Sequence, residues 1–168
     1  MWTELYWVDG PWPGRLALAA RPRGGDWLED EIASWRRAGI DAVLSLLTLE
    51  EEHDLHLETE SREARAHGME FISFPIPDRE VPNSEAKMAS TLEKLDGALS
   101  PGKNVVVHCR QGVGRTGLVA ACLLVSKGLT PETAVKTLST ARGAAVPETS
   151  EQRHWIDHYA AIFAGAKG

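Results

Sequence analysis

The stretch NVVVHCRQGVGRTGLVAA, residues 104–121, decides the fold class. Residues 104–108 contain three consecutive valines and so are apolar on both faces, as a strand buried in a parallel sheet must be. The glycines that follow predict a tight loop, and an apolar run of helical length begins at about Arg115. Strand, loop and helix in this order indicate an α/β protein. The loop starts at Cys109, so this thiol lies at the carboxyl end of the strand, where such folds bind ligands.

Strand and helix patterns alternate along the rest of the chain. This alternation is typical of an α/β domain with a mostly parallel central sheet flanked by helices on both faces. No linker interrupts the pattern, so residues 1–168 are interpreted as one domain, with a monomer as the default expectation. The other predicted strands are RLALAA (15–20), DAVLSLL (41–47) and MEFISF (69–74).

Local signals predict where the helices begin and end. Asp26 is expected to cap the first helix, and Gly39 to end it. Residues 49–67 are charged and rich in Glu and Ala, which predicts a solvated helix ending at Gly68. The face of the first helix that is expected to be buried holds Trp27, Leu28, Ile32 and Trp35. Later helices are predicted after the proline-rich loop 75–83 with Asn83 or Ser84 as cap, from about Arg115 to Lys127, after Thr130 with Pro131 in its first turn, and from about Thr149.

Composition argues against several classes of protein. The formal net charge of −6 gives no support to nucleic-acid or anionic-membrane binding, which needs a clustered basic surface. The two cysteines, Cys109 and Cys122, are too few for a disulfide framework and are expected to be reduced thiols of a cytoplasmic protein. The N-terminus does not resemble a signal peptide, and no apolar segment approaches membrane-spanning length. We therefore expect neither a nucleic-acid partner nor a membrane partner.

The glycines of the loop first suggest a dinucleotide site. Gly112, Gly114 and Gly117 form G-x-G-x-x-G, which is a weak signal when it stands alone. A dinucleotide site would also need an acidic residue about 20 positions further on, after a second strand. The sequence there reads VKTLST, which contains no acid and predicts a helix. The dinucleotide interpretation is therefore not favoured.

The spacing C-x5-R from Cys109 to Arg115 favours a phosphate-binding loop instead. The glycines let the backbone curl so that successive N–H groups point inward, and the next helix adds its positive N-terminal end. Arg115 is expected at the rim of the loop, where its guanidinium can hold two phosphate oxygens at once. The same groups stabilise a thiolate, so Cys109 is a candidate nucleophile. His108 is expected to orient the loop through hydrogen bonds from its ring.

The two cysteines receive opposite interpretations. A merely structural Cys109 would not need the Arg, Gly, Thr and His that surround it in the sequence. Cys122 has only small and aliphatic neighbours on its helix and is interpreted as a core residue. These neighbours are Ala120, Ala121, Leu123 and Leu124.

The motif HCRQGVGRTG (108–117) resembles the signature of cysteine-dependent protein tyrosine phosphatases, specifically the small dual-specificity branch. Further segments are similar to compact members related to the kinase-associated phosphatases, and together they cover nearly the whole chain. The resemblance implies the three-layer fold of that family. It also implies hydrolysis of phosphotyrosine and of phosphoserine or phosphothreonine through a cysteinyl-phosphate intermediate, without metal or cofactor. The segments are residues 25–52, FPIPDREVP (74–82) and ARGAAVPETSEQRHW (141–155).

The resemblance also implies roles for single residues. Cys109 would attack phosphorus while Arg115 and the loop amides stabilise the oxygens, and Asp78 matches the mobile general acid. Thr116 matches a hydroxyl that eases departure of the thiolate, and Gln152 matches a glutamine that positions the hydrolytic water in some relatives. A turn aspartate and an exposed helix glutamine are the alternative interpretations of Asp78 and Gln152. The loop residues implied to bind phosphate are Arg110, Gln111, Gly112, Val113, Gly114 and Arg115.

Other functions stay open on the sequence alone. A rhodanese-type sulfurtransferase also carries a cysteine in an anion-binding loop, although the extended GVGRTG and the upstream Asp78 argue against it. A phosphate-reading binding module without turnover is disfavoured because Cys109, Arg115 and Asp78 are all present. The substrate is expected to be a phosphorylated protein or a small phosphomonoester. A protein is favoured over a phosphoinositide, because the loop lacks the paired lysines of inositide-selective relatives.

Several polar residues near these motifs have ordinary structural explanations. Arg79 follows Asp78 and is either a substrate contact or a solvated side chain. Arg142 is expected to support the fold. His53 and His56 have helical spacing, but no further ligand is apparent, so a metal site is not expected.

Overall fold

The computed structural model describes residues 3–167. Its centre is a five-stranded sheet with the order β1-β2-β5-β3-β4. β1 pairs with β2 in an antiparallel manner, and all other neighbours are parallel. The mostly parallel sheet predicted from the sequence is therefore confirmed. The strands are β1 (Tyr6–Val8), β2 (Leu16–Ala19), β3 (Ala42–Ser45), β4 (Glu70–Ser73) and β5 (Val105–His108).

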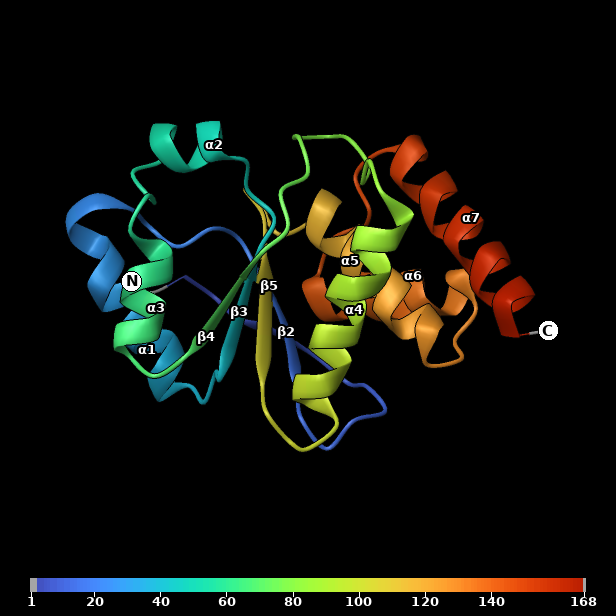
Figure 1. The fold of residues 1–168 in the computed structure, drawn as a ribbon, viewed down its shortest axis with the longest axis horizontal. Helices are drawn as coiled ribbons and strands as arrows, with labels where there is room; N and C mark the ends of the chain where they lie inside the picture. Colours follow the sequence, from blue (N-terminus) through green and yellow to red (C-terminus); the bar gives the residue numbers. More distant parts are fainter. Residues whose placement is uncertain (1–2, 168) are drawn as a thin grey trace.

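Helices cover both faces of the sheet, as predicted (Figure 1). α1 and α3 lie against one face, and α4, α5 and α6 lie on the other side, where α7 packs against α5. α2 lies beyond the end of β3, clear of both faces. The helices are α1 (Leu28–Arg37), α2 (Leu49–Asp54), α3 (Glu60–Ala66), α4 (Glu85–Leu99), α5 (Gly114–Ser126), α6 (Pro131–Arg142) and α7 (Ser150–Lys167).

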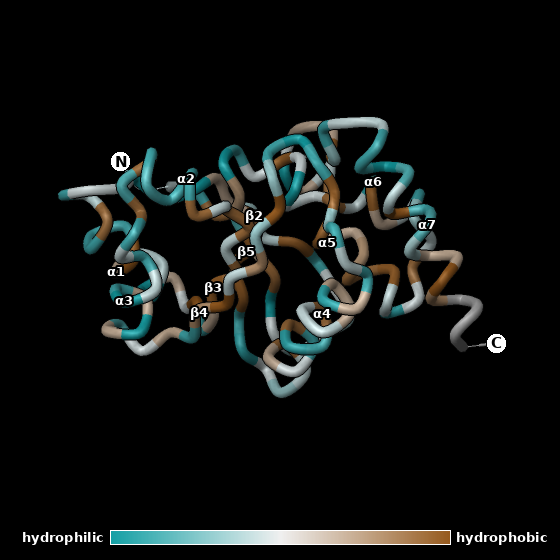
Figure 2. The backbone as a smooth tube through the Cα atoms, turned by 45° about the horizontal axis from the view of Figure 1, so that its top comes forward, coloured by the Kyte–Doolittle hydropathy of each residue, from teal (hydrophilic) through white to brown (hydrophobic). Residues whose placement is uncertain are grey.

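The hydrophobic core has two parts, one on each face of the sheet. In β5, Val105 and Val107 belong to the part under α4–α7, whereas Val106 belongs to the part under α1 and α3. Successive side chains of a strand point to opposite faces, so a strand covered on both sides must be apolar throughout. Figure 2 shows the same distribution, with hydrophobic residues along the strands and hydrophilic residues on the outer loops and helices.

The helix caps that depend on short polar side chains form largely as predicted. The Ser84 side chain, rather than that of Asn83, accepts a hydrogen bond from the Lys87 N–H at the start of α4. Thr130 accepts one from the Thr133 N–H at the start of α6, directly before Pro131. These two caps are recognisable because the hydroxyl needs only backbone groups a few residues away.

The start of the first helix differs from the prediction. Asp26 is not an N-cap, because residues Gly25–Trp27 form a 3-10 turn that leads directly into α1. Trp27 is not on the buried face: it is 56% exposed, and its ring lies 4.5 Å from the guanidinium carbon of Arg23. The prediction was wrong here because the glycine pair at 24–25 permits a tight turn that the helical periodicity does not reveal.

The sequence pattern also gave no sign of β1, a three-residue edge strand. Tyr6 pairs with Leu18, and Val8 pairs with Leu16. So short a strand depends on its partner more than on its own residues.

The charged stretch 49–67 is not one solvated helix. It forms α2 and α3, separated by a bend in which His56 has a φ of 56°. Two of its glutamates, Glu51 and Glu60, are buried with relative exposures of 7% and 1%. Buried carboxylates need partners, and both partners lie beside the cysteine loop.

Candidate active site

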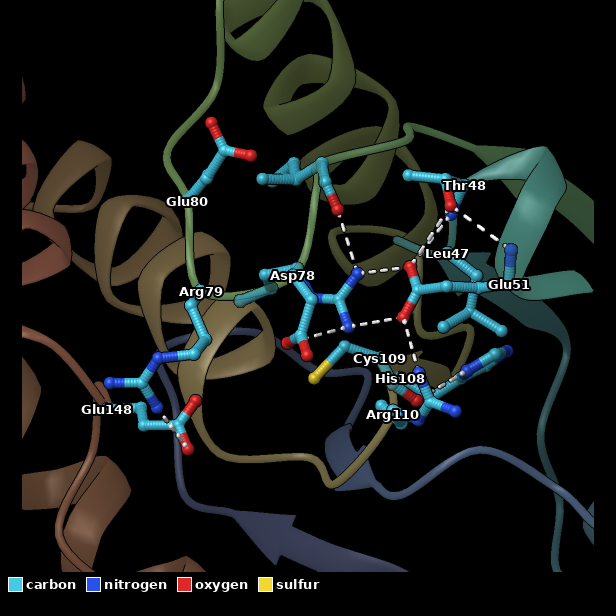
Figure 3. A network of polar contacts seen from close by, with 12 residues as sticks. Leu47, Thr48, Glu51, Asp78, Arg79, Glu80, His108, Cys109, Arg110 and Glu148 are labelled. Carbon is cyan, nitrogen blue, oxygen red and sulfur yellow. Dashed lines mark hydrogen bonds and ion pairs between the residues drawn. The ribbon is translucent and has the colours of Figure 1, made fainter. Parts of the chain in front are cut away.

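Cys109 lies directly after β5, the central strand of the sheet, and α5 begins five residues later at Gly114. Its side chain is almost buried, with 3% exposed, and it lines a pocket of about 220 Å³. In Figure 3 its sulfur lies next to the side chain of Asp78. The sequence prediction that placed this thiol at the carboxyl end of a strand is confirmed. The other residues lining the pocket are Asp78, Arg79, Arg110, Gln111, Gly114, Arg115 and Glu148.

The cysteine loop is held by its neighbours on two sides. Gly112 has a φ of 73°, and a side chain there would place its Cβ 2.5 Å from the backbone of Ala19 at the end of β2. Arg142 of α6 donates hydrogen bonds to the carbonyl oxygens of Gln111 (3.0 Å) and Gly112 (3.1 Å). The supporting role predicted for Arg142 is therefore confirmed, and the loop enters α5 as a preformed turn.

The Arg115 guanidinium is buried, with 2% of the residue exposed, and is not at the rim as predicted. Its Nη1 donates to Glu51 Oε1 at 2.6 Å and to the carbonyl oxygen of Ile76 at 2.8 Å. Its Nη2 donates to Glu51 Oε2 at 2.9 Å and to Asp78 Oδ1 at 3.2 Å. Burial alone would lower the pKa of Arg115, but the hydrogen bond to Glu51 and the charges of Cys109, Glu51 and Asp78 raise it. The side chain is thus a fixed positive charge in the lining of the pocket.

His108 is held from behind the loop by a second buried carboxylate. Its Nε2 lies 2.6 Å from Glu60 Oε2, and both side chains are at most 1% exposed. Its Nδ1 lies 3.3 Å from the carbonyl oxygen of Cys109. The ring therefore contacts the loop backbone, as predicted, and Glu60 fixes the orientation of the ring.

Asp78 reaches the pocket from the loop between β4 and α4. Its Oδ1 is the acceptor for Arg115 described above, while half of its side chain, 51%, stays exposed. Arg79, the next residue, forms an ion pair of 3.2 Å with Glu148, so it is not simply solvated. Figure 3 shows Asp78 close to Cys109, with Arg79 and Glu148 facing each other to one side.

The two remaining predicted site residues, Thr116 and Gln152, differ in their hydrogen bonding. The Thr116 hydroxyl is buried and has no hydrogen-bond partner. Gln152 is fully buried, so the alternative of an exposed helix glutamine is wrong. Its Oε1 accepts from the N–H groups of Glu148 and Thr149 at 3.1 Å, and its Nε2 donates to the carbonyl oxygen of Glu80 at 3.2 Å. With both ends of its amide engaged, Gln152 ties two loops together, and its role toward water stays a prediction.

Neither a bilayer-spanning helix nor a metal cluster is found among residues 3–167. None of the helices there combines the length and the apolar character needed to cross a membrane. No three His, Cys, Asp or Glu side chains in the same range are grouped so that they could hold a metal ion. His53 instead lies 3.2 Å from Glu58.

The family of the chain follows from comparison with known proteins. A family model described as "Swiss Army Knife protein, DSP-PTPase phosphatase domain" matches residues 5–158. The chain belongs to this dual-specificity phosphatase family. Among solved structures, a kinase-associated phosphatase with its catalytic-site cysteine replaced by serine has a TM-score of 0.89 at 22% identity, covering 98% of this chain and 97% of that one. Tk-PTP in its active form has a TM-score of 0.78 at 28% identity, covering 96% and 99%.

The sequence relatives are longer proteins. "Putative tyrosine phosphatase 197R" of Invertebrate iridescent virus 6 is 26% identical over 161 residues, which is 94% of this chain and 56% of that protein. Cyclin-dependent kinase inhibitor 3 of Sus scrofa is 33% identical over 95 residues, which is 55% of this chain and 44% of that protein. The aligned part of this phosphatase domain therefore spans less than half the length of that relative.

Three acidic residues of the phosphatase domain were not expected at the site. Glu51 binds Arg115, Glu60 binds His108, and Glu148 lines the pocket. Only Glu51 has a local signal, the spacing T-x-x-E: Thr48 and Glu51 form a reciprocal capping box at the start of α2. Glu60 and Glu148 have no signal in the neighbouring sequence, because their partners are distant in the chain.

Glu51 couples the stability of the phosphatase domain to pH. Burial alone would raise the pKa of the Glu51 carboxyl, but hydrogen bonds from Arg115 and Thr48 and the charge of Arg115 hold it below its ordinary value. Because the folded pKa is the lower one, ionised Glu51 stabilises the fold above the unfolded pKa of about 4.3, and this contribution disappears as the pH falls through the folded pKa.

We expect Glu51→Gln to lower the free energy of unfolding by about 3 kcal/mol at pH 7, because it leaves the buried charge of Arg115 without its main partner. When urea unfolding is repeated at decreasing pH, the difference from the wild type should persist down to about pH 4.3 and shrink only as the pH falls below it, through the folded pKa of Glu51. Glu50→Gln is the matched control, since Glu50 is the exposed neighbour on α2. Equal losses in both variants, or a loss that does not depend on pH, would contradict the coupling.

Proposed function

We propose that the protein hydrolyses phosphomonoesters, namely phosphotyrosine and phosphoserine or phosphothreonine in proteins, through a cysteinyl-phosphate intermediate. The convergence of Cys109, Arg115 and Asp78 in one pocket carries this proposal. A thiol, a fixed guanidinium and a half-exposed carboxyl supply a nucleophile, a group that binds phosphate oxygens and a proton donor. We also propose a cytoplasmic location, where Cys109 stays reduced.

The first step transfers the phosphoryl group to Cys109. The sulfur attacks phosphorus, the bond from phosphorus to the ester oxygen breaks, and Asp78 gives its proton to the departing oxygen. The Nη2 group of Arg115, which Asp78 occupies in this structure, is the donor that an incoming phosphate oxygen would take. Glu51 keeps the guanidinium in place throughout, because it holds both terminal nitrogens from the buried side.

The second step releases phosphate from the sulfur. Water attacks phosphorus, the P–S bond breaks, and the Asp78 carboxylate accepts the proton of the water. The unpartnered Thr116 hydroxyl is buried near the loop and supports the proposal that it donates to the departing thiolate. Each step thus returns Asp78 to the protonation state that the other one needs.

The rim of the pocket supports a protein substrate. Beyond the phosphate, a substrate meets the side chains of Arg110 and Gln111. Arg110 has 44% of its side chain exposed and is 3.7 Å from Glu51, whose charge already serves Arg115. It is therefore available to an acidic or polar group next to the phosphorylated residue.

We expect the purified protein to hydrolyse p-nitrophenyl phosphate and a phosphotyrosine peptide in the presence of EDTA. In a separate assay without EDTA, inorganic vanadate should inhibit competitively, because it occupies the same oxyanion site. A panel of phosphotyrosine, phosphothreonine and inositol phosphate substrates then ranks the substrate classes. Thiosulfate:cyanide transfer without phosphate release would show a sulfurtransferase instead, and vanadate binding without turnover would show a binding module.

A further inference from the structure

The turn that carries Asp78 has an arginine, Arg79, at the position that requires a positive φ. The Glu80 N–H donates to the carbonyl oxygen of Pro77 at 3.0 Å, which makes Asp78 and Arg79 the central residues of the turn. Arg79 has a φ of 65°, at a turn position where glycine or asparagine is usual. An arginine does not favour this conformation by itself, so contacts from outside the turn must hold it.

Two contacts hold this turn, one from Glu148 before α7 and one from Gln152 in the first turn of α7. Arg79 Nη1 lies 3.2 Å from Glu148 Oε2, and the carbonyl oxygen of Glu80 accepts the 3.2 Å hydrogen bond from Gln152. The same Gln152 amide accepts the backbone N–H of Glu148, so the segment that presents Glu148 is fixed as well. Figure 3 shows that Asp78 lies between the Arg79–Glu148 pair and the rest of the polar network.

The carboxylate of Glu148 lies in the wall of a pocket that is proposed to bind phosphate, where a negative charge is unfavourable. Glu148 lines the pocket together with Cys109, and an unpaired negative charge there would repel both the phosphate and the thiolate. The ion pair with Arg79 balances that charge. The carboxylate of Glu148 therefore does not promote phosphate binding. We assign it instead a role in holding the loop that carries Asp78.

We propose that Glu148 and Arg79 are positioning residues: their ion pair holds the 77–80 turn closed, so that the Asp78 carboxyl stays beside Cys109. This inference rests on the proposed phosphatase activity, since it assigns the pair a role through Asp78. Gln152 is the buried anchor that binds the backbone of Glu148 and, through Glu80, the turn.

The test is a cycle of variants measured by kcat/KM on a phosphothreonine peptide. Arg79→Gln and Glu148→Gln should each lower it about threefold to fivefold, as expected for an exposed ion pair. The double exchange Arg79→Glu with Glu148→Arg should recover most of the loss. In an Asp78→Asn background the same substitutions should have no further effect, because the pair acts only through Asp78.

The matched control is the exposed pair Arg153–Asp157 on α7, with an N–O distance of 3.4 Å, whose removal should leave kcat/KM unchanged. Losses that persist in the Asp78→Asn background would overturn the proposal and give Glu148 a direct part in the reaction. Unchanged activity in both single variants would overturn it as well.

Amide hydrogen exchange gives a second measurement that needs no turnover. Amides 79–81 should exchange faster in Glu148→Gln than in the wild type, and unchanged exchange would contradict the positioning role. If the wild type has no phosphatase activity and Glu148→Gln still shows the faster exchange, the proposed function is refuted while the structural role of the ion pair stays intact.

Discussion

Cys109→Ser should abolish turnover of p-nitrophenyl phosphate, with a loss in kcat on the order of 10⁶, as for removal of a nucleophile in another covalent enzyme. A serine hydroxyl is far less ionised at neutral pH than a thiol and cannot replace it as the attacking group. The variant should nevertheless bind inorganic phosphate in calorimetry, because Arg115 and its partner Glu51 are unchanged. Loss of turnover with retained binding separates the chemistry of the sulfur from the binding of the anion.

The second cysteine supplies the control for this experiment. Cys122 is fully buried on α5, and burial raises the pKa of its thiol, so it stays protonated at neutral pH. Cys122→Ala should keep turnover and lose only some stability, because it removes a packed sulfur from the core. Iodoacetate should modify the wild type at Cys109 and fail to label Cys109→Ser. Substantial turnover in the serine variant would falsify the assignment of the nucleophile.

The cysteine loop was predictable because its signals are local. The apolar strand, the glycines and the apolar helix lie within eighteen consecutive residues, 104–121. Residue 112 must be a glycine, because it has a positive φ and lies against the backbone of β2. Such constraints leave marks in a single sequence, so the position of Cys109 at the end of β5 followed from the pattern alone.

The charged stretch 49–67 shows what a local sequence pattern cannot predict. A glutamate on a helix looks the same whether it faces water or a buried arginine. Glu51 is 64 residues from Arg115 in the chain, and Glu60 is 48 residues from His108. Only the fold brings α2 and α3 against the loop that follows β5, and only then do these carboxylates become partners of the site.

The segment before α7 gives a third case, in which a motif identified the region but not the arrangement. The resemblance implied that Gln152 positions the hydrolytic water. That role stays a prediction, and in the structure the Gln152 amide is hydrogen-bonded at both ends to backbone groups. The side chain of this segment that lines the pocket belongs to Glu148. Burial depends on how the loop packs against the turn at Asp78, which the spacing of a motif does not specify.

Asp78→Asn should lower kcat/KM for a phosphothreonine peptide by about 10²–10⁴ and change that for p-nitrophenyl phosphate much less. An alkyl oxygen is a poor leaving group as an anion and needs the proton of Asp78, whereas nitrophenolate leaves without it. Asparagine keeps the shape of the side chain but has no proton to give. Equal losses on both substrates would remove Asp78 from the role of general acid.

The pH dependence tests the same assignment independently. Activity requires an ionised Cys109 and a protonated Asp78, so kcat/KM for the phosphothreonine peptide should rise and then fall with increasing pH. The fall at higher pH should be absent in Asp78→Asn, because asparagine has no ionisable group at this position. Glu80→Gln is the matched control. It removes a carboxylate two residues away on an exposed residue, whose side chain Figure 3 shows without a hydrogen bond to the other residues drawn, and it should keep the full profile. An alkaline limb that survives in Asp78→Asn would have to come from another group, such as the phosphate of the substrate itself.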